Sequence, residues 1–77
     1  MKKLVELNEG KRRELFEGSL EEMVAYLKKN EDVYKWQLDE DPDAEQPDLE
    51  NIEDWEVLEK EFDKISLGWW DLVLESL

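Results

Sequence analysis

The sequence lacks both cysteine and histidine, and these two absences exclude several kinds of chemistry. Without cysteine the chain has no disulfide bond, no zinc-thiolate site and no thiol nucleophile. Without histidine it lacks the commonest general base and the commonest transition-metal ligand. There is no glycine-rich phosphate-binding loop, and no histidine activates the hydroxyls of Ser19, Ser66 and Ser76. We therefore expect a protein that is not an enzyme and uses no metal or cofactor.

Long apolar runs are also missing. The longest apolar region, residues 67–74, is interrupted by Asp71, whereas a membrane-spanning helix requires about 20 apolar residues. Near the start, only two apolar residues separate Lys3 from Glu6, which is too few for a signal peptide. A chain of 77 residues is short enough to form one domain, 1–77, of modest stability. These features predict a soluble cytoplasmic domain that does not bind membranes.

Positive charge is scarce in the second part of the chain. The sequence has 23 acidic and 10 basic residues, which give a net charge of −13. Residues 1–30 contribute +1 to this balance, whereas residues 31–77 contribute −14. A surface of one sign speeds association with partners of the opposite sign and repels polyanions. We therefore expect no direct contact with nucleic acid, and a basic protein surface or a metal cation is the natural counterpart.

The first segment predicts a β-hairpin. Residues 3–7 and 12–16 have strand-like composition and flank the turn-like segment 8–11, which contains Gly10. A single broken helix over residues 11–17 is the alternative. In the register of a three-residue loop at 9–11, the facing pairs are Val5 with Leu15, Leu4 with Phe16, and Glu6 with the like-charged Glu14.

Residues 20–29 carry the clearest helix signal. Ser19 and Glu22 have the spacing of a capping box, in which each side chain accepts a hydrogen bond from the other residue's backbone. Two lysines occupy the last turn, where cations suit the helix dipole, and Asn30 is a suitable C-cap. The apolar face of this helix comprises Leu20, Met23, Val24 and Leu27.

Residues 33–38 alternate in the manner of a third strand, with Tyr34, Trp36 and Leu38 on one face. A stacking surface for peptides or bases is the alternative role for these aromatic residues, but a small domain without cysteine needs its large side chains inside. We therefore predict an α+β fold in which a small antiparallel sheet, the hairpin plus this third strand, packs against the capped helix.

An acidic loop is expected at residues 39–48, where Pro42 and Pro47 interrupt regular structure. Its carboxylates resemble part of an EF-hand calcium loop, with matches only at positions one, three, five and twelve. Those positions hold Asp39, Asp41, Asp43 and Glu50. Ala44 stands where that loop requires glycine, and the preceding segment reads as a strand instead of a helix. We favour a solvated acidic loop over a calcium site.

The most distinctive stretch is an amphipathic helix predicted from about Asp48 onward, with Asp48 or Asn51 as its N-cap. About sixteen residues would make it about 24 Å long. Its apolar stripe comprises Leu49, Ile52, Trp55, Leu58, Phe62 and Ile65, and charged residues occupy most of the remaining positions.

Gly68 ends this helix, and a short apolar element follows. Its pattern fits a helix or a strand equally, and we favour a short helix. In either geometry one of Trp69 and Trp70 should be buried and the other at least partly exposed.

Two functions are compatible with these features. The first is an acidic inhibitor that binds the basic nucleic-acid groove of a partner, since in size and acidity the chain resembles the small DNA mimics of phages and mobile elements, such as anti-restriction and anti-CRISPR proteins. The second is a protein interaction module that uses an exposed C-terminal tryptophan, with acidity serving solubility and association rate. The candidate partner-binding residues are Glu53, Glu56, Glu59, Asp63, Asp39, Asp41, Asp43 and Trp69.

Overall fold

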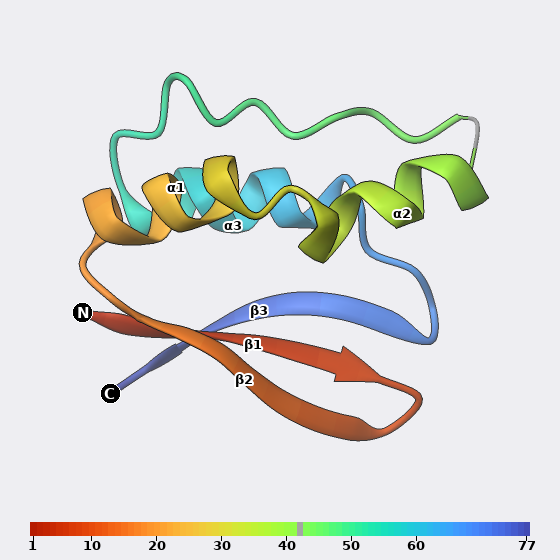
Figure 1. The fold of residues 1–77 in the computed structure, drawn as a ribbon, viewed down its shortest axis with the longest axis horizontal. Helices are drawn as coiled ribbons and strands as arrows, with labels where there is room; N and C mark the ends of the chain where they lie inside the picture. Colours follow the sequence, from red (N-terminus) through yellow and green to blue (C-terminus); the bar gives the residue numbers. More distant parts are fainter. Residues whose placement is uncertain (42) are drawn as a thin grey trace.

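The computed structural model describes residues 1–41 and 43–77, which form a three-stranded antiparallel sheet with three helices on one of its faces (Figure 1). The fold is therefore α+β, as the sequence predicts. The strand order is β2-β1-β3, so the first strand is central. The elements are β1 (Lys2–Asn8), β2 (Lys11–Gly18), α1 (Leu20–Lys29), α2 (Asp32–Glu40), α3 (Trp55–Asp63) and β3 (Trp70–Ser76).

β1 and β2 form the predicted hairpin, but their loop is one residue shorter than expected. Asn8 pairs with Lys11, so only Glu9 and Gly10 remain in the turn. Their φ angles are 52° and 83°. A type I′ turn requires positive φ at both central residues, and its twist matches that of the flanking strands.

The hairpin register differs from the predicted one beyond its first pairs. Leu4 faces Phe16 as expected, and an irregularity then shifts the pairing by one residue. The next pairs are Val5 with Glu14 and Glu6 with Arg13. Because Arg13 Nη2 lies 3.2 Å from Glu6 Oε1, an ion pair replaces the predicted like-charge contact.

The helix α1 matches its prediction at both ends. The Glu22 backbone N–H donates to Ser19 Oγ at 3.2 Å, and the Ser19 N–H donates to Glu22 Oε1 at 2.9 Å, which completes the capping box. Asn30 is the C-cap. Met23 and Leu27 are fully buried, so the predicted apolar face is the one that packs on the sheet.

The strand predicted at residues 33–38 is wrong, because this segment belongs to the helix α2. Tyr34 and Gln37, one turn apart, are both buried, which is the spacing of a helical face. The i,i+4 pair Glu31 and Lys35 also approaches to 3.6 Å. A strand needs a neighbouring strand to pair with. Both edges of the central strand β1 are already paired, one with β2 and the other with β3, so residues 33–38 cannot pair with it.

The third strand of the sheet is the C-terminal element, where the sequence favoured a helix and kept a strand as the alternative. Trp70 and Leu72 are buried on the side that faces the helices. The ring of Trp70 meets that of Trp36 of α2 at a centroid distance of 4.9 Å in an edge-to-face arrangement. Trp70 is 1% exposed and Trp69 is 48% exposed, which confirms the predicted division between the two tryptophans.

The acidic helix is shorter than predicted, because α3 begins at Trp55 and its N-cap is Asp54. At nine residues it is about 14 Å long rather than about 24 Å. Upstream, Asp48 Oδ1 accepts the Glu50 N–H at 3.0 Å, a local turn that competes with helix formation. Leu49 still belongs to the buried core, so the apolar stripe was identified correctly although its first part is not helical.

The core lies between the sheet and the helical layer, and the connection from α2 to α3 runs along the outer side of the helices (Figure 1). The other face of the sheet carries no helix among the described residues. There Arg12 of β2 forms ion pairs with Glu14 and with Glu75 of β3, and so spans the central strand. Val5 of that central strand is fully buried outside the main core.

Candidate functional site

Three of the predicted partner-binding carboxylates share one face of α3. Glu56, Glu59 and Asp63 follow one another at spacings of three and four, and all three are exposed. Leu58 and Phe62 of the same helix are buried in the core. Within the described residues none of the three carboxylates forms an ion pair. We call Glu56, Glu59 and Asp63 the α3 row.

The other charges around the α3 row modify it in two ways. Lys60 follows Glu56 by four residues, so its cation lies on the same helical face and reduces the local charge. Glu53 is exposed but precedes the helix, in the irregular segment before Asp54. The rigid part of the predicted carboxylate ladder therefore consists of three residues rather than four.

Glu61 of α3 has a structural role distinct from the row. Its Oε1 accepts the Asp48 backbone N–H at 2.7 Å and a bond from Lys64 Nζ at 3.1 Å. Its side chain is only 12% exposed. These contacts attach the connection between α2 and α3 to the helix that carries the acidic row. Sequence reasoning did not single out Glu61, because in the sequence it is one of several closely spaced acidic residues and nothing local distinguishes it from the exposed ones.

The acidic residues at 39–43 lie apart from the α3 row. Asp39 is in the last turn of α2, Asp41 is the C-cap, and the Asp43 N–H donates to Asp41 Oδ1 at 3.0 Å. Pro42, predicted to interrupt regular structure, lies outside the described residues. Residues 43–54 run the length of the helical layer, so the end of α2 and the start of α3 lie at opposite ends of that path (Figure 1). The predicted site is therefore two acidic regions.

The EF-hand likeness is limited to spacing. A helix does precede the acidic loop, so the predicted strand there was the wrong argument against calcium binding. However, Asp39 lies inside that helix, and Glu50 forms a 3.4 Å ion pair with Lys28. The following helix begins only at Trp55. Among the described residues, no group of three or more carboxylates is placed to hold a metal ion.

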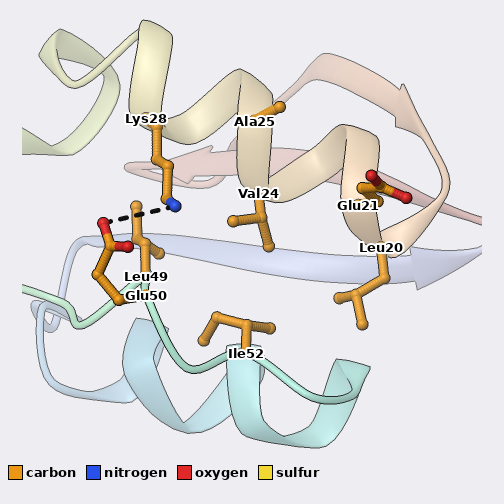
Figure 2. Close-up of a pocket in the computed structure, with 8 residues that line it drawn as sticks. All are labelled: Leu20, Glu21, Val24, Ala25, Lys28, Leu49, Glu50 and Ile52. Atoms are coloured by element: carbon orange, nitrogen blue, oxygen red, sulfur yellow. Dashed lines mark ion pairs between the residues drawn. The ribbon is translucent and has the colours of Figure 1, made fainter.

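An apolar pocket that sequence reasoning missed lies between α1 and residues 49–52. Figure 2 shows Leu20 and Val24 of α1 directed toward Ile52, with the Lys28 and Glu50 ion pair at one end. Its volume is about 360 Å³. No local pattern indicates this pocket, because the sequence predicts Ile52 to lie on the buried apolar stripe of one continuous helix.

Trp69 lies beside a second hollow, at the end of the sheet near the hairpin turn. This hollow has a volume of about 550 Å³. Its residues include apolar side chains, two glycines and two carboxylates, namely Leu7, Glu9, Gly10, Leu67, Gly68, Trp69, Trp70 and Asp71. Trp69 and Leu7 are exposed, and the Trp69 ring lies 5.7 Å from that of Trp36. Asp71 Oδ1 is buried and accepts no hydrogen bond from the described part of the chain.

Four carboxylates that form hydrogen bonds within the fold have lowered pKa values. Hydrogen bonds from Lys3 and Arg12 lower the pKa of Glu14, and the hydrogen bond from Arg12 lowers the pKa of Glu75. The Ser19 backbone N–H lowers the pKa of Glu22, and the Glu50 backbone N–H lowers that of Asp48. These groups stabilise the sheet, α1 and the connection, and none of them belongs to the α3 row.

In the part of the chain that the structure describes, no helix is both long and apolar enough to cross a membrane. Compared with protein-family models, with curated proteins and with solved structures, the chain has no match. The geometry and charge of these surfaces are therefore the basis for inferring a function.

Proposed function

We propose that this protein is a non-enzymatic inhibitor that binds the basic nucleic-acid-binding surface of a partner protein. The observation that carries the proposal is the α3 row: three exposed carboxylates on one helical face, without ion pairs among the described residues, on a helix anchored by Leu58 and Phe62. A surface of this kind attracts a cluster of arginine and lysine side chains.

The geometry of α3 suits this role because its charges are held in place before binding. Carboxylates three and four residues apart on a helix have Cβ atoms about 5 to 6 Å apart. Duplex DNA carries about one charge per 1.7 Å of its axis, so such a row approximates part of a line of phosphates. A helix that is already packed on the core loses less conformational entropy on binding than a flexible acidic loop does.

The rest of the molecule supports binding rather than catalysis. The Ser19 hydroxyl caps α1, and Glu61 holds the connection to α3. With these groups committed to the fold, the exposed carboxylates have neither histidine nor cysteine to act with. The proposed activity is that of small DNA mimics from phages and mobile elements, which include anti-restriction and anti-CRISPR proteins, and the proposed location is the cytoplasm.

The test compares two baits of equal net charge. In the first, Glu53, Glu56, Glu59 and Asp63 are changed to lysine. In the second, four exposed acidic residues of other elements are changed to lysine: Glu17, Glu21, Asp32 and Glu40. A partner captured by the parent is purified, and its binding to a labelled duplex is measured by fluorescence anisotropy.

We expect the parent and the control bait to displace the duplex, and the α3 variant to fail, although circular dichroism shows all three folded. Neutral replacement of Asp39, Asp41 and Asp43 should have a smaller effect, because these residues lie away from the α3 row. If the partner binds the protein and the duplex together, or if the α3 variant competes as well as the parent, the proposal is wrong.

A second candidate function is an interaction module centred on Trp69. It is favoured by the exposure of Trp69 and Leu7 beside one hollow. In that case Trp69→Ala should abolish capture of the partner, and salt should have little effect on the affinity. A contact made by the acidic surface should instead weaken steeply as ionic strength rises, since salt screens exposed charges.

A further inference from the structure

We infer that the hollow beside Trp69 binds an arginine side chain of the partner. The hollow brings together an exposed indole, two apolar side chains and two carboxylates, and this combination matches the parts of arginine: an apolar stem and a planar cation. The inference rests on the proposed function only in assigning the arginine to the partner's basic surface. The chemistry of the hollow is argued from its own residues.

Asp71 provides the polar part of the argument. Its Oδ1 is buried and receives no hydrogen bond from the described residues. The Asp71 side chain is only partly exposed where it lines the hollow, so water screens its negative charge less than that of a fully exposed carboxylate. Glu9, at the hairpin turn, is a second carboxylate of the same hollow. A guanidinium with its forked donors suits two carboxylates better than a single ammonium does.

Trp69 provides the aromatic part. Its side chain is 48% exposed, although its ring is held 5.7 Å from that of Trp36. An exposed but fixed indole face attracts cations, and among side chains arginine stacks on it best because the guanidinium is flat. Leu7, 36% exposed, and the half-buried Leu67 offer apolar surface for the methylene stem.

Arg12, which lies across the hairpin from Leu7, does not fill this role. Arg12 faces Leu7 in the sheet, but its guanidinium is bonded to Glu14 and Glu75. Asp71 faces Leu7 from the other strand and forms no ion pair in the described residues. The carboxylate and the indole are therefore available to a cation from outside the molecule.

Gly68 supplies a way to close the hollow without changing its charge. A Cβ atom added at Gly68 meets nothing within 4 Å, so a larger side chain there is accommodated on the outside of the fold. Because Gly68 lines the hollow, Gly68→Phe should cover part of it while leaving the core unchanged. Asp71→Asn is the complementary variant, because it removes the charge and keeps the shape.

The test titrates the isotopically labelled full chain with N-acetyl-arginine amide and follows the Trp69 indole N–H by NMR. We expect a saturable shift with about millimolar affinity, as suits a single side chain. N-acetyl-norleucine amide, which has a stem but no cation, should bind about tenfold more weakly. Asp71→Asn should weaken arginine binding by about fivefold, the loss expected for a partly exposed ion pair. Gly68→Phe should abolish it.

Three results would each overturn the inference: no saturable shift of Trp69, equal binding of the norleucine and arginine amides, or loss of binding in the control variant that carries lysine at Glu17, Glu21, Asp32 and Glu40. The last result would mean that the arginine amide is attracted by the overall negative charge of the protein and not by this hollow. Because no partner protein is used, this titration is independent of the competition assay. Arginine binding at Trp69 without duplex displacement would refute only the proposed function, and the reverse result would refute only the arginine site.

Discussion

Glu6 shows how one polar residue is fitted into an apolar core. The indole Nε1 of the buried Trp70 donates to Glu6 Oε2 at 3.0 Å, and Arg13 approaches the other carboxylate oxygen at 3.2 Å. The carboxylate is 14% exposed, so most of it is withdrawn from water. The carboxylate therefore satisfies the indole N–H and is itself balanced by a cation.

Replacing Glu6 with alanine should lower the free energy of unfolding by about 1 to 3 kcal/mol, because the buried indole N–H loses its acceptor. Glu6→Gln keeps an acceptor oxygen and is the matched control, which should lose less. Urea denaturation of both variants measures the difference. Equal stability of the alanine and glutamine variants would show that the bond to Trp70 contributes nothing.

The buried face of α1 is equally sensitive to single changes. Met23→Asp and Leu27→Asp should each unfold the domain, because each places a charge at a fully buried position. Ala25→Asp, on the exposed side of the same helix, should leave it folded. Circular dichroism during heating distinguishes these outcomes, and an unchanged melting temperature for both buried variants would refute the assignment of this face.

At the scale of elements, α1 and α3 begin in the same way. In α1 the Ser19 hydroxyl accepts the Glu22 N–H, and in α3 the Asp54 carboxylate accepts the Val57 N–H at 2.9 Å. Each bond satisfies one of the backbone donors that a helix leaves unpaired at its first turn. The two helices that pack most closely on the sheet are therefore the ones with side-chain caps.

Ser19→Ala should destabilise the protein by about 1 kcal/mol, the usual effect of losing a helix cap. Ser19→Asp retains an acceptor beside the N-terminus of the helix and should lose much less. The comparison is made by chemical denaturation at neutral pH. Should alanine and aspartate prove equally destabilising, the cap would not be the source of the effect.

Local patterns predicted α1, the hairpin and the apolar stripe of α3, but they failed for α2 and β3. The capping box at Ser19 is a signal within four residues, so nothing distant is needed to recognise it. Residues 33–38 and 70–76 each fit two periodicities. Their assignment depends on which of them pairs with β1, a contact between segments more than sixty residues apart in the case of β3.

At the scale of the whole molecule, charge is divided between paired and unpaired carboxylates. The open face of the sheet holds Glu14 and Glu75 in ion pairs with Lys3 and Arg12. Of the thirteen acidic residues from 39 to 63, only Glu50 and Glu61 form ion pairs in the described structure. On the sheet, Glu14 and Glu75 are paired with cations. Most of the unpaired carboxylates belong to residues 39–63, in the helical layer.

This division predicts a pH effect confined to the paired carboxylates. The folded state holds the pKa of Glu14 below its ordinary value of 4.5, so its contribution to stability is present above that value and is lost as pH falls through the folded pKa. The stability difference between the parent and Glu14→Gln should therefore be largest near neutral pH and should vanish in strong acid.

The control for this experiment is Glu17→Gln, which removes an exposed carboxylate of the same strand that forms no ion pair in the described residues. Urea midpoints measured at several pH values for the parent and both variants provide the comparison. A difference for Glu14→Gln that stays constant from neutral pH into strong acid would contradict the role of its ion pairs.

The α3 row was predictable in part, because exposed carboxylates on an amphipathic helix follow from spacing alone. The length of α3 was not predictable. Leu49 packs into the core from an irregular segment, but its spacing from the apolar residues of α3 is the same as that of a helical stripe. The hollow at Trp69 was not predictable either. It requires the hairpin turn, Gly68 and Asp71 to meet, and these come from the two ends of the chain.

Composition, helix caps and charge balance are local or additive properties, so they can be determined from the sequence alone. The sequence thus establishes the absence of cysteine chemistry, the capped helix at residues 20–29 and the acidic second part of the chain. Strand pairing and surface hollows depend on contacts between distant residues. The strand order β2-β1-β3 and the buried Asp71 oxygen are of this kind. Several segments have similar periodicity. Only the contacts of the folded state determine which of them pairs with the sheet and covers the core.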